Sequence, residues 1–506
     1  MGRHLLTCLI FLPLAAALIQ GFIPARHMRM LRIALTGTTV VQLLLFAFLT
    51  VGGTSLEENM EWFSIGSGTD MLFSTRYHLG LDGLSLPLVG MSLVTLLAAS
   101  LASWKITRQF KGYSLLFQLL NTAVLGTFCA LDMFLFYVFF EFMLIPMYFL
   151  VGIWGGEKRT QAAIKFFLYT LTGSILILIA MIVIAAGAGS LDVDQIKAIA
   201  GEGTLLDPVQ VTTLAGLPVR TWVFFLLLTG FAIKIPVVPL HTWLPEAHVE
   251  APTAISVILA AILLKTGTYG LIRYTGMIFP SEWLQFSTFI GTMAVLSIVY
   301  GGLNALAAKD LKRLVAYSSV SHMGFVLLGM AAGTVTGMEG AVYQMVSHGF
   351  ISAMLFLIAG VLQDRTGTRQ IEFFSGLHER MPVYTTVVFV AFFAAMGIPG
   401  FSAFIGEVLV LLGSYSSENL PGWMAVTATL GIVLSAGYLL WTITRIIFGP
   451  FLVRSDDAME DLKPLELVLF IPLAVLIIWL GLWPAPLLEW INPFAQEWAG
   501  LFPTAN

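Results

Sequence analysis

The strongest constraint on the fold of this chain is a succession of long apolar runs. A membrane-spanning helix needs about 20 consecutive, mostly apolar residues. Fourteen runs of the 506-residue chain are close to this length or longer: 4–23, 31–51, 82–104, 112–131, 133–152, 163–187, 219–241, 251–273, 283–306, 310–332, 338–361, 383–412, 422–447 and 466–487. Because these runs are continuous and do not alternate in polarity, they exclude an outer-membrane barrel. They predict an all-α polytopic membrane protein with about 14 transmembrane helices.

Composition supports the membrane assignment and excludes several classes of protein. Charged residues make up 11% of the chain and the mean hydropathy is +0.90, whereas soluble globular chains have about 25% charged residues. The net charge of −4 and the lack of a long basic tract exclude nucleic-acid binding. The two cysteines, Cys8 and Cys129, cannot by themselves bind a cluster or a structural zinc ion. No dinucleotide or Walker motif is present, so the sequence predicts no cofactor-binding and no metal-binding residues.

Lys and Arg in the loops predict the orientation of the helices. Of the 25 basic residues, 18 lie in alternate loops, which places those loops on the cytoplasmic side. The opposite loops hold five: Arg3, Arg76, Lys197, Arg220 and Arg273. This asymmetry predicts a multi-pass protein of a bacterial inner membrane with both termini on the periplasmic side. The first run is long enough to span the bilayer, and its Arg cluster follows it, so a retained helix is favoured over a signal peptide.

The order of the runs predicts an inverted repeat. Runs four to eight and nine to thirteen form two groups of five, and an odd number of helices reverses the starting side of the second group. The predicted units are residues 1–111 with helices 1–3, 112–275 with the first repeat, 280–450 with the inverted repeat, and 451–506 with helix 14.

Helices 7 and 12 hold matching positions in the two repeats, and each carries Pro in mid-span. Pro236 and Pro239 lie in one and Pro399 in the other, and interior Pro breaks a helix. Kinks used only for packing are the alternative. A matched pair beside ionisable residues favours an ion path.

Four ionisable residues lie well inside the runs: Glu141, Lys234, Lys265 and Glu407. Each costs about 2.5–3.5 kcal/mol at a helix centre. A purely structural Glu141–Lys234 ion pair is the alternative, but it leaves Lys265 and Glu407 unexplained. We therefore expect a Glu141–Lys234 pair that loads a proton, Lys265 as the next station and Glu407 as a further station or exit.

Histidines lie along the same route. His322 and His348 are candidate proton relays, with hydrogen-bonded packing as an equal alternative. His241 and His248 are expected to have a structural role or to line an entrance.

Three charged residues near helix ends receive simpler interpretations. Asp82 is expected to cap a helix, and Arg273 is expected to extend to the outer interface. Asp310 is expected to lie in a solvated cluster on the inner surface.

Three segments carry a resemblance to a known family. They read MFLFYVFFEFMLIPMY at 133–148, AIKIPVVPLHTWLPEAHVEAPT at 232–253 and KRLVAYSSVSHMGFV at 312–326. The chain resembles the proton-translocating membrane subunits of respiratory complex I and the related Mrp antiporters. It is most similar to the NuoM-type, or chain 4, members, because of His248 and Glu250, because of Glu407 where the NuoL type has Lys, and because a long lateral helix is absent. The similar Mrp chain is an alternative.

The resemblance implies a function and roles for single residues. Glu141, Lys234, Lys265 and Glu407 match the family's proton-translocating positions, and His322 and His348 match its polar axis. The implied function is proton translocation as a subunit of NADH:quinone oxidoreductase, a translocase whose redox centres lie on other chains.

The resemblance also implies partners. FMN, iron–sulfur clusters and quinone are expected on partner subunits, and NuoL-type and NuoN-type chains and a peripheral redox arm are expected neighbours. The alternatives are an Mrp-type cation/proton antiporter subunit, a hydrogenase-linked pump subunit, and a structural spacer.

Overall fold

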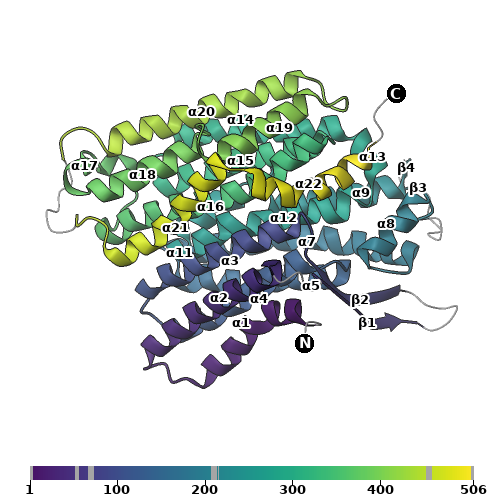
Figure 1. The fold of residues 1–506 in the computed structure, drawn as a ribbon, viewed down its shortest axis with the longest axis horizontal. Helices are drawn as coiled ribbons and strands as arrows, with labels where there is room; N and C mark the ends of the chain where they lie inside the picture. The colour runs from purple at the N-terminus through teal and green to yellow at the C-terminus, as the bar shows by residue number, and fades with distance from the viewer. Residues whose placement is uncertain are drawn as a thin grey trace.

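The structure is a computed structural model that describes residues 4–51, 56–66, 73–206, 213–214, 216–451 and 459–502. Long helices dominate this part of the chain and run roughly side by side (Figure 1). Twelve are long and apolar enough to cross a membrane, and each coincides with a predicted run. Their bounds are Leu5–Phe22 (α1), Met28–Val51 (α2), Ser85–Lys105 (α3, Ser85–Ala102, with η2, Ser103–Lys105), Phe110–Cys129 (α4), Met133–Trp154 (α5, Met133–Phe142, with α6, Leu144–Trp154), Arg159–Ala188 (α7), Thr253–Gly276, Ser287–Ala307 (α14), Leu311–Ala331 (α15), Val335–Thr366 (α16), Trp423–Ile446 (α20) and Pro464–Leu482 (α21). The predicted helical membrane fold is confirmed.

The other two predicted runs are interrupted helices. The first run contains α9 (Val219–Lys234), and the chain continues after the break into α10 (Trp243–Glu250). The second contains α18 (Pro382–Ala395) and α19 (Ser402–Tyr415). Gly397 and Gly400 adopt φ of +69° and +96° in the second break, a conformation that favours glycine. The breaks lie where mid-span Pro predicted them, whereas the inverted relation of the two repeats stays a prediction.

One span contains two π-helical turns. It consists of α11 (Thr253–Ile258), a π-helical turn η3 (Leu259–Leu263), α12 (Leu264–Gly270) and a second π-helical turn η4 (Leu271–Gly276). π-helical turns are rare and are frequent at functional sites. Lys265 is the second residue after the first of them.

Short elements lie at the two ends of the bundle. They are α8 (Val193–Gly201), α13 (Pro280–Gln285), α17 (Leu377–Arg380), η5 (Ile371–Phe373) and two antiparallel hairpins, β1 (Glu57–Ile65) with β2 (Phe73–Gly80) and β3 (Thr213–Leu214) with β4 (Leu217–Pro218). The C-terminal helix α22 (Ala485–Gly500) packs instead against α16 and α3. The first hairpin pairs Glu57 with Gly80 and Ile65 with Phe73. Both hairpins and α8 lie at one end of the bundle and α17 at the other (Figure 1). Both hairpins lie between predicted runs, in segments 52–81 and 188–218, for which the sequence predicts loops.

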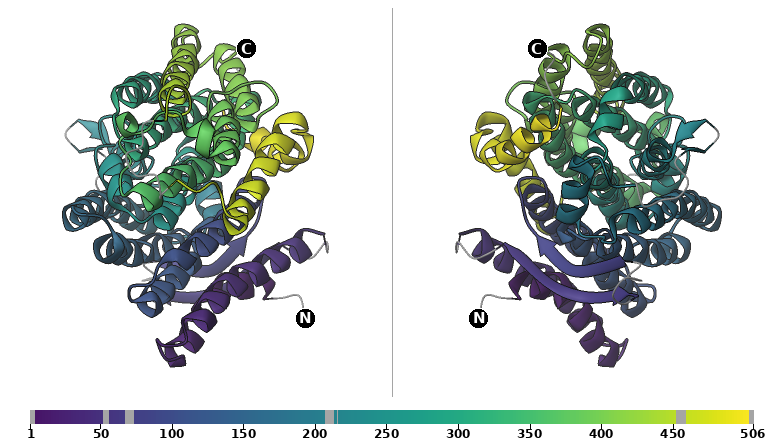
Figure 2. Two further views of the ribbon diagram at one scale, coloured as in Figure 1. Left: turned by 90° about the vertical axis from the view of Figure 1, so that its left-hand side faces the viewer. Right: turned by 90° about the vertical axis from the view of Figure 1, so that its right-hand side faces the viewer.

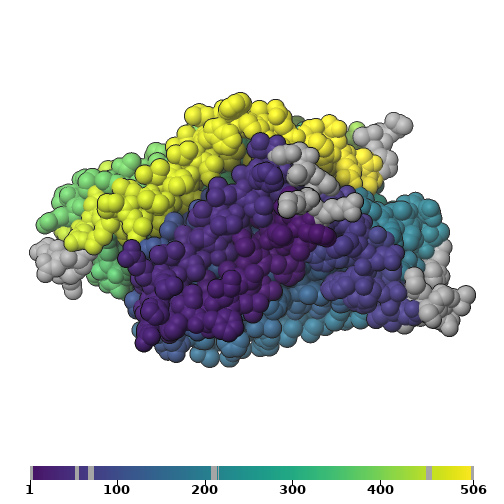
Figure 3. Space-filling view, turned by 60° about the horizontal axis from the view of Figure 1, so that its bottom comes forward, coloured from purple at the N-terminus to yellow at the C-terminus, as the bar shows by residue number. Residues whose placement is uncertain are grey.

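Burial separates the interior helices from the peripheral ones. In the apolar stretches of α16 and of the 253–276 span, all residues are buried, whereas in those of α1 and α2 one-third of the residues are buried. α1 and α2 lie at the edge of the bundle (Figure 2), and α21 and α22 cross the same face beside α3 (Figure 3). Exposed apolar side chains on the peripheral helices suit contact with lipid. Polar residues on α16 and on the 253–276 span therefore lie in the protein interior.

Side-chain caps fix the starts of several spans. Asp132 accepts hydrogen bonds from the backbone N–H groups of Phe134 and Leu135 at the start of α5. Thr334 accepts one from Gly337 at the start of α16. These bonds satisfy N–H groups that a helix start leaves free.

Two of the simpler interpretations are wrong. Arg273 does not extend to the interface, because its side chain is buried and its Nη2 atom lies 2.6 Å from Asp82 Oδ2. Asp310 is not part of a solvated cluster, because it is buried, caps α15 through the N–H of Arg313, and pairs with Arg369. In both places an ion pair offsets the cost of burying a charge. The capping role of Asp82 is confirmed by hydrogen bonds from the N–H groups of Leu84 and Ser85.

Candidate functional site

Lys265 and His348 form a direct contact in the centre of the molecule. Lys265 Nζ lies 2.6 Å from His348 Nδ1 and also donates a hydrogen bond of 2.9 Å to the carbonyl of Ala260. Ala260 belongs to the π-helical turn η3. Both ionisable side chains are buried, and 83 residues separate them along the chain.

Two further ionisable side chains, His322 and Glu407, follow His348 in the interior. The rings of His348 and His322 are tilted, with their centroids 5.6 Å apart. His322 Nδ1 lies 3.2 Å from Glu407 Oε1. This is an ion-pair distance for a protonated imidazole, but the two groups are not aligned as a hydrogen bond. Lys265, His348, His322 and Glu407 thus form a continuous buried series, which we call the central polar chain.

Four helices supply the central polar chain, namely α12, α16, α15 and α19. α16 packs against both α15 and α19. Small residues permit a close approach of α16 and α19, and a Cβ added at Gly406 would lie 2.6 Å from Gln344 Oε1 and 3.0 Å from its Cα atom. The neighbouring Glu407 is thereby held against the interior of α15 and α16.

Lys234 lies apart from these groups, at the last residue of α9. Its side chain is buried, and Nζ has no hydrogen-bond partner among the described residues. The ammonium group instead faces two aromatic rings, with the centroids of Phe140 at 4.7 Å and Phe166 at 5.9 Å. Cation–π contacts and the negative end of the α9 dipole stabilise its charge.

Glu141 is not in contact with Lys234. Its Oε1 atom is buried without a hydrogen-bond partner, and within the described part of the chain no ion pair of 4.0 Å or less joins it to Lys234. The expected direct pair is therefore absent from this conformation. A proton can pass between Glu141 and Lys234 only through a water molecule or after the side chains move.

His241 and His248, the two remaining candidate histidines, lie against aromatic rings. His248 is buried, its ring stacks on Phe356 with centroids 4.4 Å apart, and neither ring nitrogen has a partner among the described residues. His241 packs against the rings of Tyr300 and Tyr317.

Lys312 is a buried cation that the sequence analysis did not select. Its Nζ atom donates a hydrogen bond of 2.9 Å to the carbonyl of Ala251. A cavity of about 330 Å³ reaches Lys312 from the surface beside Glu250 and Asp364. Lys309, Lys312 and Arg313 lie together at the start of α15 and therefore suggested a surface cluster. For this reason the burial of Lys312 was not predicted.

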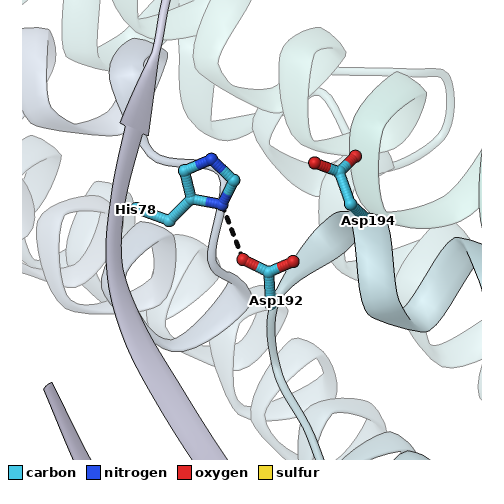
Figure 4. Close-up of side chains that lie close together, drawn as sticks. All are labelled: His78, Asp192 and Asp194. Carbon is cyan, nitrogen blue, oxygen red and sulfur yellow. Dashed lines mark hydrogen bonds and ion pairs between the residues drawn. The ribbon is translucent and has the colours of Figure 1, made fainter. Parts of the chain in front are cut away.

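A second cluster that sequence reasoning missed lies beside the β1–β2 hairpin. His78 Nδ1 lies 2.6 Å from Asp192 Oδ2, and Nε2 lies 3.0 Å from Glu57 Oε1. Burial lowers the pKa of His78, but Asp192 and Glu57 outweigh it and raise the pKa above its ordinary value. His78, Asp192 and Asp194 are the one group among the described residues that could hold a metal ion (Figure 4).

Comparison with known proteins places the chain in a family. Residues 130–435 match the family described as NADH:quinone oxidoreductase/Mrp antiporter, TM. NADH-quinone oxidoreductase subunit M of Rhodobacter capsulatus is 40% identical over 97% of this chain and 95% of its own length. NADH-ubiquinone oxidoreductase chain 4 of Chondrus crispus is 40% identical over 85% and 87%.

Solved structures agree with the sequence comparison. A chain of respiratory complex I from Thermus thermophilus superposes with a TM-score of 0.84, at 29% identity and over 99% of this chain and 100% of that one. A chain of the Mrp complex from Dietzia superposes with a TM-score of 0.80 at 20% identity, covering 98% and 100%, which indicates a shared fold. The chain therefore belongs to the NADH:quinone oxidoreductase/Mrp antiporter family of membrane subunits, in its subunit M or chain 4 branch, as the sequence motifs predicted.

Proposed function

We propose that this chain is the M-type membrane subunit of a proton-translocating NADH:quinone oxidoreductase and that the central polar chain carries its protons. The observation that carries the proposal is the buried series from Lys265 through His348 and His322 to Glu407. Each member can hold or release a proton, and adjacent members are in contact or within reach of one small movement. Such groups in a membrane interior are typical of proton relays.

Lys234 and Glu141 form the loading part of the proposed route. Lys234 has aromatic neighbours but no hydrogen-bond acceptor, so its charge is sensitive to the approach of a carboxylate. Movement of Glu141 toward Lys234 would favour the charged lysine, and movement away would favour release of a proton toward Lys265.

The proposed setting follows the family and the basic residues of the loops. The chain would lie in a bacterial inner membrane with both termini on the periplasmic side and with NuoL-type and NuoN-type chains as neighbours. FMN and iron–sulfur clusters would lie on partner chains, and quinone would bind there too, so redox energy reaches this chain through its contacts with them. The 40% identity to subunit M over nearly the full length favours this setting over an Mrp antiporter.

The test removes one ionisable group from the middle of the central polar chain. We expect His322→Leu in the assembled complex, reconstituted in liposomes, to lower the number of protons moved per NADH oxidised. His27→Leu, at an exposed histidine, is the matched control and should leave that ratio unchanged. An unchanged ratio in a fully assembled His322→Leu complex would exclude the proposed route.

A further inference from the structure

The cluster around His78 has the geometry of a ligand set. His78 lies on β2, and its side chain is 1% exposed. Asp192 caps α8 and is also buried, whereas Asp194 lies in the first turn of α8 and is exposed. One ligand atom of each of these three residues lies within 4.8 Å of the other two. In Figure 4 the imidazole of His78 faces the two carboxylates across a short gap.

Neighbouring groups orient His78 Nδ1 and Asp192 Oδ2 toward each other, as ligand atoms of one ion would be. Asp192 Oδ1 accepts the hydrogen bond from the Gln195 N–H, so Oδ2 is directed at the imidazole. Glu57 Oε1 lies 3.0 Å from His78 Nε2 on the opposite side of the ring. A carboxylate behind a histidine fixes the ring and its tautomer in many metal sites. The arrangement leaves Nδ1 to face Asp192.

We propose that His78, Asp192 and Asp194 bind a divalent transition-metal ion of the zinc class. One imidazole nitrogen and two carboxylate oxygens suit zinc, whereas calcium and magnesium prefer oxygen ligands alone. Three protein ligands leave the remaining position to water. Bonds of about 2.0–2.2 Å require Nδ1 and Oδ2, now 2.6 Å apart, to separate slightly as the ion replaces the proton between them.

The bound ion would connect two distant parts of the chain. β2 follows the second span and α8 follows α7, and 114 residues separate His78 from Asp192. Asp132, which caps α5, accepts a hydrogen bond from Thr75 of β2 and pairs with Asp192 in a short β-bridge. An ion here would therefore stiffen the end of the molecule from which α5, the helix of Glu141, begins.

The test measures zinc bound by the assembled complex after treatment with a chelator. Equilibrium dialysis against ZnCl₂, read by elemental analysis, would compare the unaltered complex with Asp194→Asn and with the control Glu202→Gln, at an exposed acidic residue just after α8. We expect the unaltered and control complexes to bind one more zinc ion than Asp194→Asn, or to bind that ion at least tenfold more tightly. Because Asp194 is exposed, its substitution does not disturb the buried pair of His78 and Asp192.

Two further measurements identify the ligands. X-ray absorption of the additional zinc should show a single imidazole together with oxygen ligands, and His78→Gln should abolish that ion. Equal zinc binding by the unaltered complex and Asp194→Asn would overturn the proposal, as would zinc that persists in His78→Gln. Either result would make His78 and Asp192 a proton-bridged pair only.

Discussion

The ionisable residues of the two broken helices differ in their contacts. At the end of α9, Lys234 Nζ faces the rings of Phe140 and Phe166 and has no hydrogen-bond partner among the described residues. In α19, just after the second break, Glu407 lies 3.2 Å from His322 and so joins the central polar chain. The first break therefore holds an isolated charge, and the second holds a connected one.

We propose that this difference gives the two broken helices separate tasks. An isolated buried charge responds strongly to any carboxylate or water that approaches it, because little else compensates it. A connected charge passes its proton to a neighbour over a short distance. Under this proposal, the break after α9 serves loading and switching, and the break before α19 serves conduction.

The largest expected effect comes from replacing the isolated lysine. Lys234→Met should lower the rate of proton translocation by the reconstituted complex about a hundredfold, the scale of a lost proton-transfer group. It should not lower the thermal stability of the complex, because Lys234 makes no hydrogen bond that Met would lose. Lys463→Met, at an exposed residue, is the control for charge. Full translocation by Lys234→Met would remove this residue from the proposed route.

A smaller effect is expected on stability at the connected end. His348→Leu removes an acceptor from the buried Lys265 ammonium, which then retains only the Ala260 carbonyl. The free energy of unfolding should fall by about 1–3 kcal/mol, the cost of leaving a buried polar group unsatisfied. Denaturation in detergent, followed by circular dichroism, would measure it.

His248→Leu is the matched control for this change. His248 is equally buried, but neither of its ring nitrogens has a hydrogen-bond partner in the described structure. Its replacement should therefore be nearly neutral. Equal destabilisation by the two substitutions would show that the Lys265–His348 contact is not stronger than simple packing.

The apolar runs and their Pro residues predicted the frame of this molecule well. Twelve spans and both breaks follow from run length and from Pro, which are local properties of the sequence. The four residues of the central polar chain were also all selected, because ionisable groups inside apolar runs are costly and conspicuous. The sequence could not predict which of these residues touch one another, since 83 residues separate Lys265 from His348.

The failures have physical reasons of their own. The Glu141–Lys234 pair was expected from opposite charge, but the ammonium of Lys234 faces the ring of Phe140 instead. The β1–β2 hairpin carries many polar residues and lies between two spans, so it resembled a loop. His78 meets Asp192 only because this hairpin folds onto α8, which no local pattern reveals.

A third prediction concerns the spacing of α16 and α19. Gly406→Ala places a Cβ atom 3.0 Å from the Cα atom of Gln344, which is tighter than ordinary packing and should destabilise by about 1–3 kcal/mol. If α19 moves outward to relieve the contact, the separation of His322 and Glu407 grows and translocation falls as well. Gly437→Ala, where nothing lies within 4 Å, should instead be neutral or slightly stabilising.

The smallest expected effect concerns the aromatic surroundings of Lys234. Phe166→Leu removes the more distant of the two rings, at 5.9 Å, and should weaken the stabilisation of the ammonium by about 0.5 kcal/mol. Phe140→Leu removes the ring at 4.7 Å and should have the larger effect of the two. Both changes should shift the pH dependence of translocation in the same direction, since a less stabilised ammonium releases its proton at lower pH. An unchanged pH profile in both variants would show that polar groups or water, and not the rings, govern the charge of Lys234, and the contrast between the two breaks would then disappear.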